Sequence, residues 1–151
     1  IGTGGGFPAI PLKILRPQQP MTLVDASRKK INFIKHIVRQ LQLTRIQPLH
    51  ARAQDLARDP QHSRHYPVII CRALAELPVI MQLASPLLAE NGRMIAMKGP
   101  QEPGGCPEAD GVPTQERVNE RNFHVRTITY QLPVLGDQRR LVIIDAQSEP
   151  E

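Results

Sequence analysis

The glycine-rich segment at the start of the chain, Gly2-Thr3-Gly4-Gly5-Gly6, is the feature that most constrains the fold. Glycine lets a backbone adopt left-handed conformations and approach a ligand closely. Such turns usually connect a buried parallel strand to a helix, and Pro8 is suited to start that helix. Because only Ile1 precedes the glycines, we expect the first strand of the sheet to be absent from this chain.

The next segment has the pattern of a strand followed by an amphipathic helix. Residues 21–24 form a short apolar run that ends at Asp25, and Ser27 is placed to cap a helix. The apolar residues of this helix follow the 3.6-residue period: Ile31, Ile34, Ile37, Val38 and Leu41. Strand and helix therefore follow the glycine turn in the order that an α/β sheet requires.

The same alternation continues to about residue 98. We expect strands at 46–50, 68–71 and 94–97. The uninterrupted apolar run 68–71 is typical of a fully buried strand in a parallel sheet. A second helix is expected from about Leu77 to Asn91-Gly92, which would stop it.

The C-terminal third begins with a segment rich in proline and glycine. Residues 99–113 hold four prolines and four glycines, so we expect a loop there. Two strands follow at 123–132 and 140–145, and Gly136-Asp137 near the turn indicates an antiparallel hairpin. The chain is thus predicted to be one α/β domain over residues 1–151, incomplete at its N-terminus. It would have a doubly wound, mostly parallel sheet with a C-terminal antiparallel hairpin.

Charge and composition favour a polyanion partner. The net charge is +5, and between Lys13 and Arg64 eleven Lys or Arg residues stand against three acids. With only 3% aromatic residues, contacts to RNA would be basic rather than stacked. The alternative is a solvated basic surface without a partner. Cys71 and Cys106 form no disulfide framework or zinc spacing, and His62 and His65 have no thiol or carboxylate close by, so we expect no metal and a reducing cytoplasm. No apolar run approaches the length of a membrane helix, so we expect no membrane span.

The candidate ligand site lies at the carboxyl ends of the strands, where doubly wound sheets bind ligands. Asp25 falls 23 residues after Gly2, where a carboxylate can accept hydrogen bonds from both hydroxyls of a ribose. The glycines follow G-x-G-x-G, and Phe7 stands where the dinucleotide pattern needs its third glycine. This difference favours S-adenosylmethionine over a dinucleotide, and the lack of a following G-K-[ST] excludes a P-loop.

Two stretches of sequence resemble the RsmG family, also called GidB. They are Gly2-Thr3-Gly4-Gly5-Gly6-Phe7-Pro8-Ala9-Ile10-Pro11-Leu12 and Leu23-Val24-Asp25-Ala26-Ser27-Arg28-Lys29-Lys30. The resemblance continues through His50-Ala51-Arg52-Ala53-Gln54, Cys71-Arg72-Ala73-Leu74-Ala75 and Ala96-Met97-Lys98-Gly99. Ala9 and Gln54 depart from the family pattern, which has Gly and Glu at these positions.

The resemblance implies a class I methyltransferase that transfers a methyl group from S-adenosylmethionine to N7 of a guanine in 16S ribosomal RNA. It also implies seven donor-binding residues: Gly2, Gly4, Phe7, Asp25, Ala53, Gln54 and Arg72. No catalytic acid or base is expected, because guanine N7 is unprotonated and the enzyme only has to align the reactants. Two alternatives stay open, namely a class I methyltransferase with a different substrate and a non-catalytic RNA-binding module with the same fold.

The substrate is expected to be ribosomal RNA or the small ribosomal subunit, bound mainly through phosphates. The candidate RNA-binding residues are basic and come from several parts of the chain: Arg28, Lys29, Lys30, Arg52, Lys98, Arg139 and Arg140. Arg72 has a second interpretation as the partner of Glu76, four residues further on.

Overall fold

The computed structural model describes residues 1–100 and 114–147. It has four helices and seven strands within these residues: α1 (Ala9–Leu15), β1 (Met21–Asp25), α2 (Arg28–Gln40), β2 (Ile46–His50), α3 (Ala53–Leu56), β3 (Tyr66–Arg72), α4 (Leu77–Ala84), β4 (Leu88–Lys98), β5 (Thr114–Val118), β6 (Arg121–Gln131) and β7 (Gln138–Ala146). The α/β class expected from the sequence is confirmed. No helix in the described part combines the length and apolar character of a membrane crossing.

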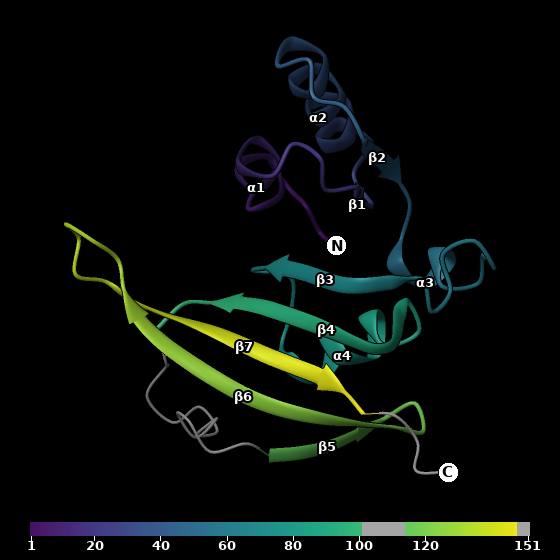
Figure 1. Cartoon of the computed structure of the whole chain (residues 1–151), viewed down its shortest axis with the longest axis vertical. Coiled ribbons are helices and arrows are strands. Elements are labelled where there is room, and N and C mark those ends of the chain that lie inside the picture. The colour runs from purple at the N-terminus through teal and green to yellow at the C-terminus, as the bar shows by residue number, and fades with distance from the viewer. Residues whose placement is uncertain (101–113, 148–151) are drawn as a thin grey trace.

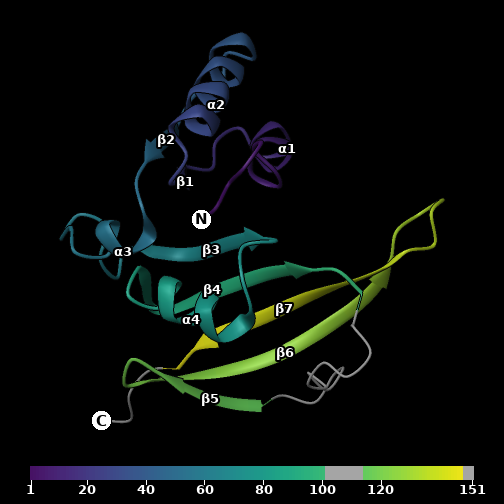
Figure 2. The same ribbon diagram turned by 180° about the vertical axis from the view of Figure 1, so that it is seen from behind.

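The strands form two separate sheets. The first contains β1 and β2, which pair in parallel, and the second has the order β3-β4-β7-β6-β5. In the second sheet β3 and β4 are parallel and the remaining pairs are antiparallel. Figures 1 and 2 show the first sheet with α1 and α2 at one end of the molecule, and the amino terminus lying between the two sheets.

The N-terminal region, which we define as α1, β1, α2 and β2, forms as the sequence predicts. Ser27 caps α2, its hydroxyl accepting the Lys30 N–H at 3.5 Å. Ile31 and Ile34 are fully buried, and they pack with Ile10 and Leu23 into a small apolar cluster. The cap and the apolar spacing therefore position α2 over β1, and with it the turn that follows Asp25.

The larger core belongs to the five-stranded sheet and α4. Its most enclosed side chains include Phe123, Val142 and Ile144. Arg121 is also buried, and its guanidinium donates to the carbonyls of Ser85, Leu88 and Ala89 at 2.8–2.9 Å. These bonds tie β6 to the connection between α4 and β4. The antiparallel hairpin predicted from 123–132 and 140–145 is confirmed as β6 and β7.

Several boundaries differ from the sequence-based expectation. Helix α4 ends at Ala84 rather than at Asn91-Gly92, because Pro86 has no N–H to continue it. Asn91 and Gly92 lie inside β4, where the pairing with β3 is irregular between Tyr66 and Val68. A side chain at Gly92 would start 2.8 Å from Leu88 Cγ. The glycine thus permits close packing at an irregular point of the strand.

The sequence analysis also did not predict strand β5 or the partial exposure of β3. Residues 114–118 are mostly polar and exposed, so this edge strand carries no apolar signal. The expected full burial of 68–71 is wrong at Val68, which is 51% exposed, and at Ile70, which is half-buried. These two residues project from one face of β3, while Ile69 and Cys71 on the other face are buried in the core. Residues 101–113, most of the predicted Pro/Gly-rich loop, lie outside the described residues.

Candidate functional site

The glycine turn has the backbone geometry that its sequence predicts. Gly2, Gly4 and Gly6 all have positive φ angles, 62°, 55° and 93°. A Cβ at Gly2 would lie 2.5 Å from the Leu74 side chain, and a Cβ at Gly6 would lie 2.7 Å from Ile10. Gly4 and Gly5 have no such neighbours, since the space beside them is open apart from the Gly2 carbonyl at 4.0 Å. The middle of the turn is therefore the part that a ligand can approach.

Asp25 links this turn to the start of α2. Its Oδ2 accepts the Gly4 N–H at 2.9 Å, and its Oδ1 accepts the Ser27 N–H at 2.8 Å. The side chain is buried. A carboxylate has about four lone-pair sites, so each oxygen keeps acceptor capacity after these bonds. The structure thus gives Asp25 a positioning role, and its predicted contact with a ribose stays a prediction.

The end of β2 lies against the same segment. His50 Nε2 is 3.0 Å from the carbonyl oxygen of Ala26, and the Ala51 N–H donates to the Asp25 carbonyl at 3.3 Å. Ala53 and Gln54 follow at the start of α3, with Ala53 half-buried and Gln54 exposed. Both therefore lie in the first turn of α3, shortly after β2 ends beside Asp25, and their predicted contact with the methyl donor stays a prediction. Sequence reasoning gave His50 no role, although it ends β2 as Asp25 ends β1.

The loop after β3 lies next to the glycine turn. Its Leu74 side chain contacts Gly2, and Arg72 at the end of the strand is exposed. Lys98 Nζ donates to the Ala75 carbonyl at 2.9 Å and lies 3.8 Å from Glu76 Oε2. Only 17% of the Lys98 side chain is exposed. Lys98 therefore anchors the loop, and it is Lys98 rather than Arg72 that lies beside Glu76.

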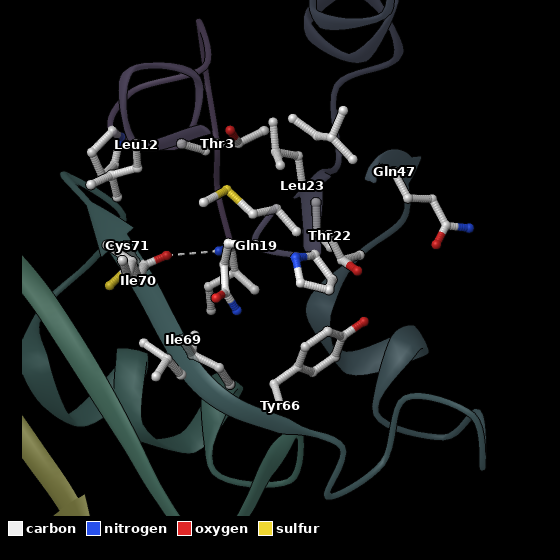
Figure 3. A pocket seen from close by; sticks show the side chains of 18 of the residues that line it. Thr3, Leu12, Gln19, Thr22, Leu23, Gln47, Tyr66, Ile69, Ile70 and Cys71 are labelled. Carbon is white, nitrogen blue, oxygen red and sulfur yellow. Dashed lines mark hydrogen bonds between the residues drawn. The ribbon is translucent and has the colours of Figure 1, made fainter. Parts of the chain in front are cut away.

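A cavity of about 950 Å³ lies next to this cluster, between β1 and β3. Figure 3 shows Thr3, Thr22 and Tyr66 among the side chains around it. Phe7 and Arg72 are the predicted donor-binding residues that line it, while Gly2, Gly4, Asp25, Ala53 and Gln54 do not. The cavity and the cluster at the strand ends are thus neighbouring but different places.

The candidate RNA-binding residues lie in two separate areas. Arg28, Lys29 and Lys30 are exposed in the first turn of α2, and Arg52 is exposed just before α3. Arg139 pairs with Asp137 at 3.0 Å, and Arg140 Nε donates to the Gly99 carbonyl at 3.3 Å. Figures 1 and 2 show α2 and the β6–β7 turn far apart in both views.

Two titratable side chains near the site are His50 and the buried Cys71. Burial raises the pKa of the Cys71 thiol, which keeps it protonated and unreactive. Within residues 1–100 and 114–147, no three His, Cys, Asp or Glu side chains are grouped in a way that could hold a metal ion. The site instead consists of backbone N–H groups, one carboxylate and exposed arginines.

Comparison with solved structures agrees with this architecture. A methyltransferase dependent on S-adenosylmethionine from Aquifex aeolicus superposes with a TM-score of 0.60 at 14% identity, covering 95% of this chain and 78% of that one. PKMT2 from Rickettsia typhi, solved in complex with AdoHcy, gives a TM-score of 0.54 at 17% identity, covering 65% of this chain and 19% of that one. At these identities the likeness establishes the class I methyltransferase fold.

Comparison of the amino-acid sequence with curated proteins identifies relatives of this chain. The chain is 46% identical over 101 residues to ribosomal RNA small subunit methyltransferase G of Desulfitobacterium hafniense, a match that covers 67% of this chain and 42% of the relative. It is 40% identical over 150 residues to the protein of that name from Deinococcus radiodurans, covering 97% of this chain and 56% of the relative. The chain spans about half the length of these curated relatives. The family model described as "rRNA small subunit methyltransferase G" matches residues 1–131, and the chain therefore belongs to this family, GidB.

Proposed function

We propose that this chain is the donor-binding domain of a methyltransferase that uses S-adenosylmethionine to methylate N7 of a guanine in 16S ribosomal RNA. The observation that carries the proposal is the glycine turn held against Asp25, in a chain that belongs to the GidB family. The relatives' name supports ribosomal RNA of the small subunit as the substrate. A ribosomal substrate also favours a cytoplasmic location.

The residues at the strand ends fit such a donor. The open face of Gly4 and Gly5 leaves room for a ligand directly against the backbone, and a side chain at either position would fill that room. Asp25 is already fixed by two N–H donors, so its remaining acceptor sites are preorganised for the hydroxyls of a ribose. We expect Ala53 and Gln54, which follow the contact of Ala51 with Asp25, to flank the adenine of the donor.

The chemistry asks for alignment rather than proton transfer. The sulfonium of S-adenosylmethionine supplies an already activated methyl group, and guanine N7 carries a free lone pair. The task of the chain is to hold both reactants at attack distance, a proximity effect that provides about 7–11 kcal/mol in well-oriented systems. The exposed Arg72 can contact guanine O6 or a phosphate, but a bidentate contact to O6 and N7 would cover the nucleophile.

The basic start of α2 is the best-supported RNA contact. Arg28, Lys29 and Lys30 place three cations at the positive end of a helix dipole, with no acidic residue in that turn. This arrangement is locally unfavourable for the helix. No ion pair offsets it among the described residues. The Asp25 carboxylate, which accepts the Ser27 N–H, brings one negative charge to this end of the helix, and a bound phosphate backbone would add more.

Calorimetry tests the donor assignment. We expect S-adenosylmethionine or S-adenosylhomocysteine to bind and NAD to bind more weakly or not at all. Asp25→Ala should weaken binding by about 1–3 kcal/mol, since it removes a charged acceptor. Asp137→Ala is the control, because Asp137 lies in the exposed β6–β7 turn. NAD binding as tight as that of the methyl donor would contradict the assignment.

Salt-dependent binding to small-subunit RNA tests the substrate surface. Reversing Arg28, Lys29 and Lys30 to Glu should lower affinity and flatten the salt dependence, because three phosphate contacts are lost. The reversal also favours the helix dipole, so α2 should remain folded. The matched control reverses the charge of three exposed arginines outside α2, namely Arg16, Arg58 and Arg117. Equal losses in both variants would refute a specific role for α2, and undiminished binding in the α2 variant would favour Arg139 and Arg140.

A further inference from the structure

His50 lies at the end of β2, where the sequence indicates no function. The parallel register of the two-stranded sheet places it directly opposite Asp25, the last residue of β1, and Figures 1 and 2 show the two strands side by side. The chain continues from Asp25 into α2 and from His50 into α3, which begins with Ala53 and Gln54. A contact between the two strand ends therefore joins the segment proposed to hold the ribose to the one proposed to flank the adenine.

The His50 imidazole holds a single peptide unit. Its Nε2 lies 3.0 Å from the carbonyl oxygen of Ala26. A carbonyl oxygen can only accept a hydrogen bond, so Nε2 carries the hydrogen and donates it. The same peptide unit supplies the Ser27 N–H, which donates to Asp25 Oδ1 at 2.8 Å. Because a peptide unit is planar, its carbonyl and its N–H turn together, and the imidazole thus holds the N–H against the carboxylate.

The orientation of the Asp25 carboxylate depends on two N–H donors from different segments. The Gly4 N–H, which belongs to the left-handed backbone of the glycine turn, donates to Oδ2 at 2.9 Å. The Ser27 N–H belongs to the connection between β1 and α2, and there the Ala51 N–H also donates to the Asp25 carbonyl at 3.3 Å. The end of β2 therefore holds both peptide units that follow Asp25, one through the backbone of Ala51 and one through the side chain of His50.

We propose that His50 is a positioning residue for the methyl donor, which keeps the Asp25 carboxylate in the orientation that accepts the ribose hydroxyls. The inference rests on the proposed function and adds a side chain that acts without touching the donor. Consecutive hydrogen bonds polarise one another, so imidazole, peptide unit and carboxylate form one connected network. The His50 side chain is exposed, so its replacement removes this hydrogen bond and little packing.

A double-mutant cycle on donor binding tests whether His50 acts through Asp25. His50→Leu should weaken the binding of S-adenosylhomocysteine about three- to tenfold, the range expected for the loss of one hydrogen bond. In an Asp25→Ala background the same substitution should change the affinity less than about twofold, because the carboxylate that it positions is gone. His50→Gln should recover most of the binding, since an amide N–H can donate to the same carbonyl. His36→Leu, at an exposed position of α2, is the matched control.

Hydrogen exchange in the ligand-free chain tests the same contact without the donor. His50→Leu should speed exchange of the Ser27 amide about threefold or more, because its peptide unit is no longer held at the carbonyl. The Ile31 amide, which donates to the Ser27 carbonyl inside the first turn of α2, should keep its rate and so show that the helix is intact. His36→Leu should change neither amide.

Three results would overturn the inference. Equal losses of affinity from His50→Leu with and without the Asp25 carboxylate would show that His50 does not act through Asp25. A His50→Gln variant that binds no better than His50→Leu would show that the donated hydrogen bond is not what matters. Unchanged exchange at Ser27 would show that the imidazole does not hold this peptide unit. Failure of the proposed function has a different signature, since the unaltered chain would then bind no S-adenosylhomocysteine.

Discussion

The N-terminal region and the five-stranded sheet differ in how they are held together. Among the described residues, the larger cluster has sixteen buried apolar residues, which come mostly from the five-stranded sheet and α4 but include Val24 of β1 and Leu56 of α3, whereas the cluster within the N-terminal region has four. Both regions expose some large apolar side chains, among them Leu15 and Phe33 in the N-terminal region and Val68 and Ile128 in the five-stranded sheet. The N-terminal region depends more on polar anchors such as Lys13 and Asp25.

The candidate donor site lies between the two regions, since Asp25 ends β1, Arg72 ends β3, and the glycine turn and the start of α3 lie beside them. We expect the N-terminal region, with its smaller core, to be the less stable side of this site.

This contrast predicts that the two regions lose structure separately. In the N-terminal region, hydrophobic burial is small and the sheet has two strands, which is marginal by itself. The β3–β4 platform should therefore keep its structure under conditions in which α1 and α2 open. The following substitutions test whether the two regions lose structure separately.

Phe123→Ala should have the largest effect. Phe123 is fully buried in the five-stranded sheet, so its removal leaves a cavity and should lower the free energy of unfolding by about 3–5 kcal/mol. Phe33→Ala on α2 is the matched control, because half of Phe33 is exposed. Denaturant unfolding followed by far-UV circular dichroism measures both. A similar loss in the two variants would remove the proposed difference between the regions.

Lys13→Met should destabilise only the N-terminal region. Lys13 is fully buried, and its Nζ donates to the carbonyls of Pro17, Gln19 and Arg45 at 2.6–3.3 Å. Methionine fills the space but leaves these carbonyls without their donor, a loss of about 2–3 kcal/mol. Lys35→Met, at an exposed position of α2, is the control. Native-state hydrogen exchange should show faster opening in α1 and α2 with unchanged protection in β6 and β7, and equal acceleration in both regions would contradict separate opening.

Gly4→Ala should have a smaller effect on stability, together with a loss of donor binding. Its φ of 55° imposes about 1–2 kcal/mol of strain on any residue with a Cβ. Gly5→Ala is the control for conformation, because Gly5 has no positive φ and no atom near its Cβ position. Thermal unfolding should therefore separate the two variants, while calorimetry with S-adenosylhomocysteine should show weaker binding in both. A Gly4 variant that is as stable as the Gly5 variant would show that the turn relaxes without strain.

The Arg93–Asp145 pair should matter least. These residues face each other across β4 and β7, and Arg93 Nη2 lies 3.2 Å from Asp145 Oδ2 with both side chains partly exposed. A double-mutant cycle with Arg93→Gln and Asp145→Asn should give a coupling of about 0.2–1 kcal/mol that shrinks in high salt. A coupling above that range, unaffected by salt, would mean that the large sheet depends on polar anchors between β4 and β7, as the N-terminal region does.

Local signals in the sequence predicted much of the N-terminal region. Ser27 and the apolar spacing of Ile31 and Ile34 identify α2, and the alternate glycines predict left-handed backbone at Gly2 and Gly4. These features depend on residues close together in the chain, which is why sequence alone shows them.

Features set by distant neighbours were missed or misplaced. The polar residues of β5 become a strand only because β6 offers them an edge. The predicted helix stop at Asn91-Gly92 is wrong, because Gly92 lies in β4. There it packs closely on Leu88, which leaves no room for a side chain. The role of Lys98 as an anchor for the loop at Ala75 could not be predicted, since the two residues meet only through the pairing of β3 and β4.

Hydrogen exchange with and without S-adenosylhomocysteine tests most directly the claim that the donor site lies at the strand ends, where the glycine turn meets Asp25. The two amides to follow are those of Gly4 and Ser27, which donate to the Asp25 carboxylate. We predict that ligand slows exchange at both amides, because it stabilises the turn and the start of α2 together, and leaves Phe123 and Val142 unchanged. Binding that protects other amides and leaves Gly4 and Ser27 as exposed as before would contradict this account.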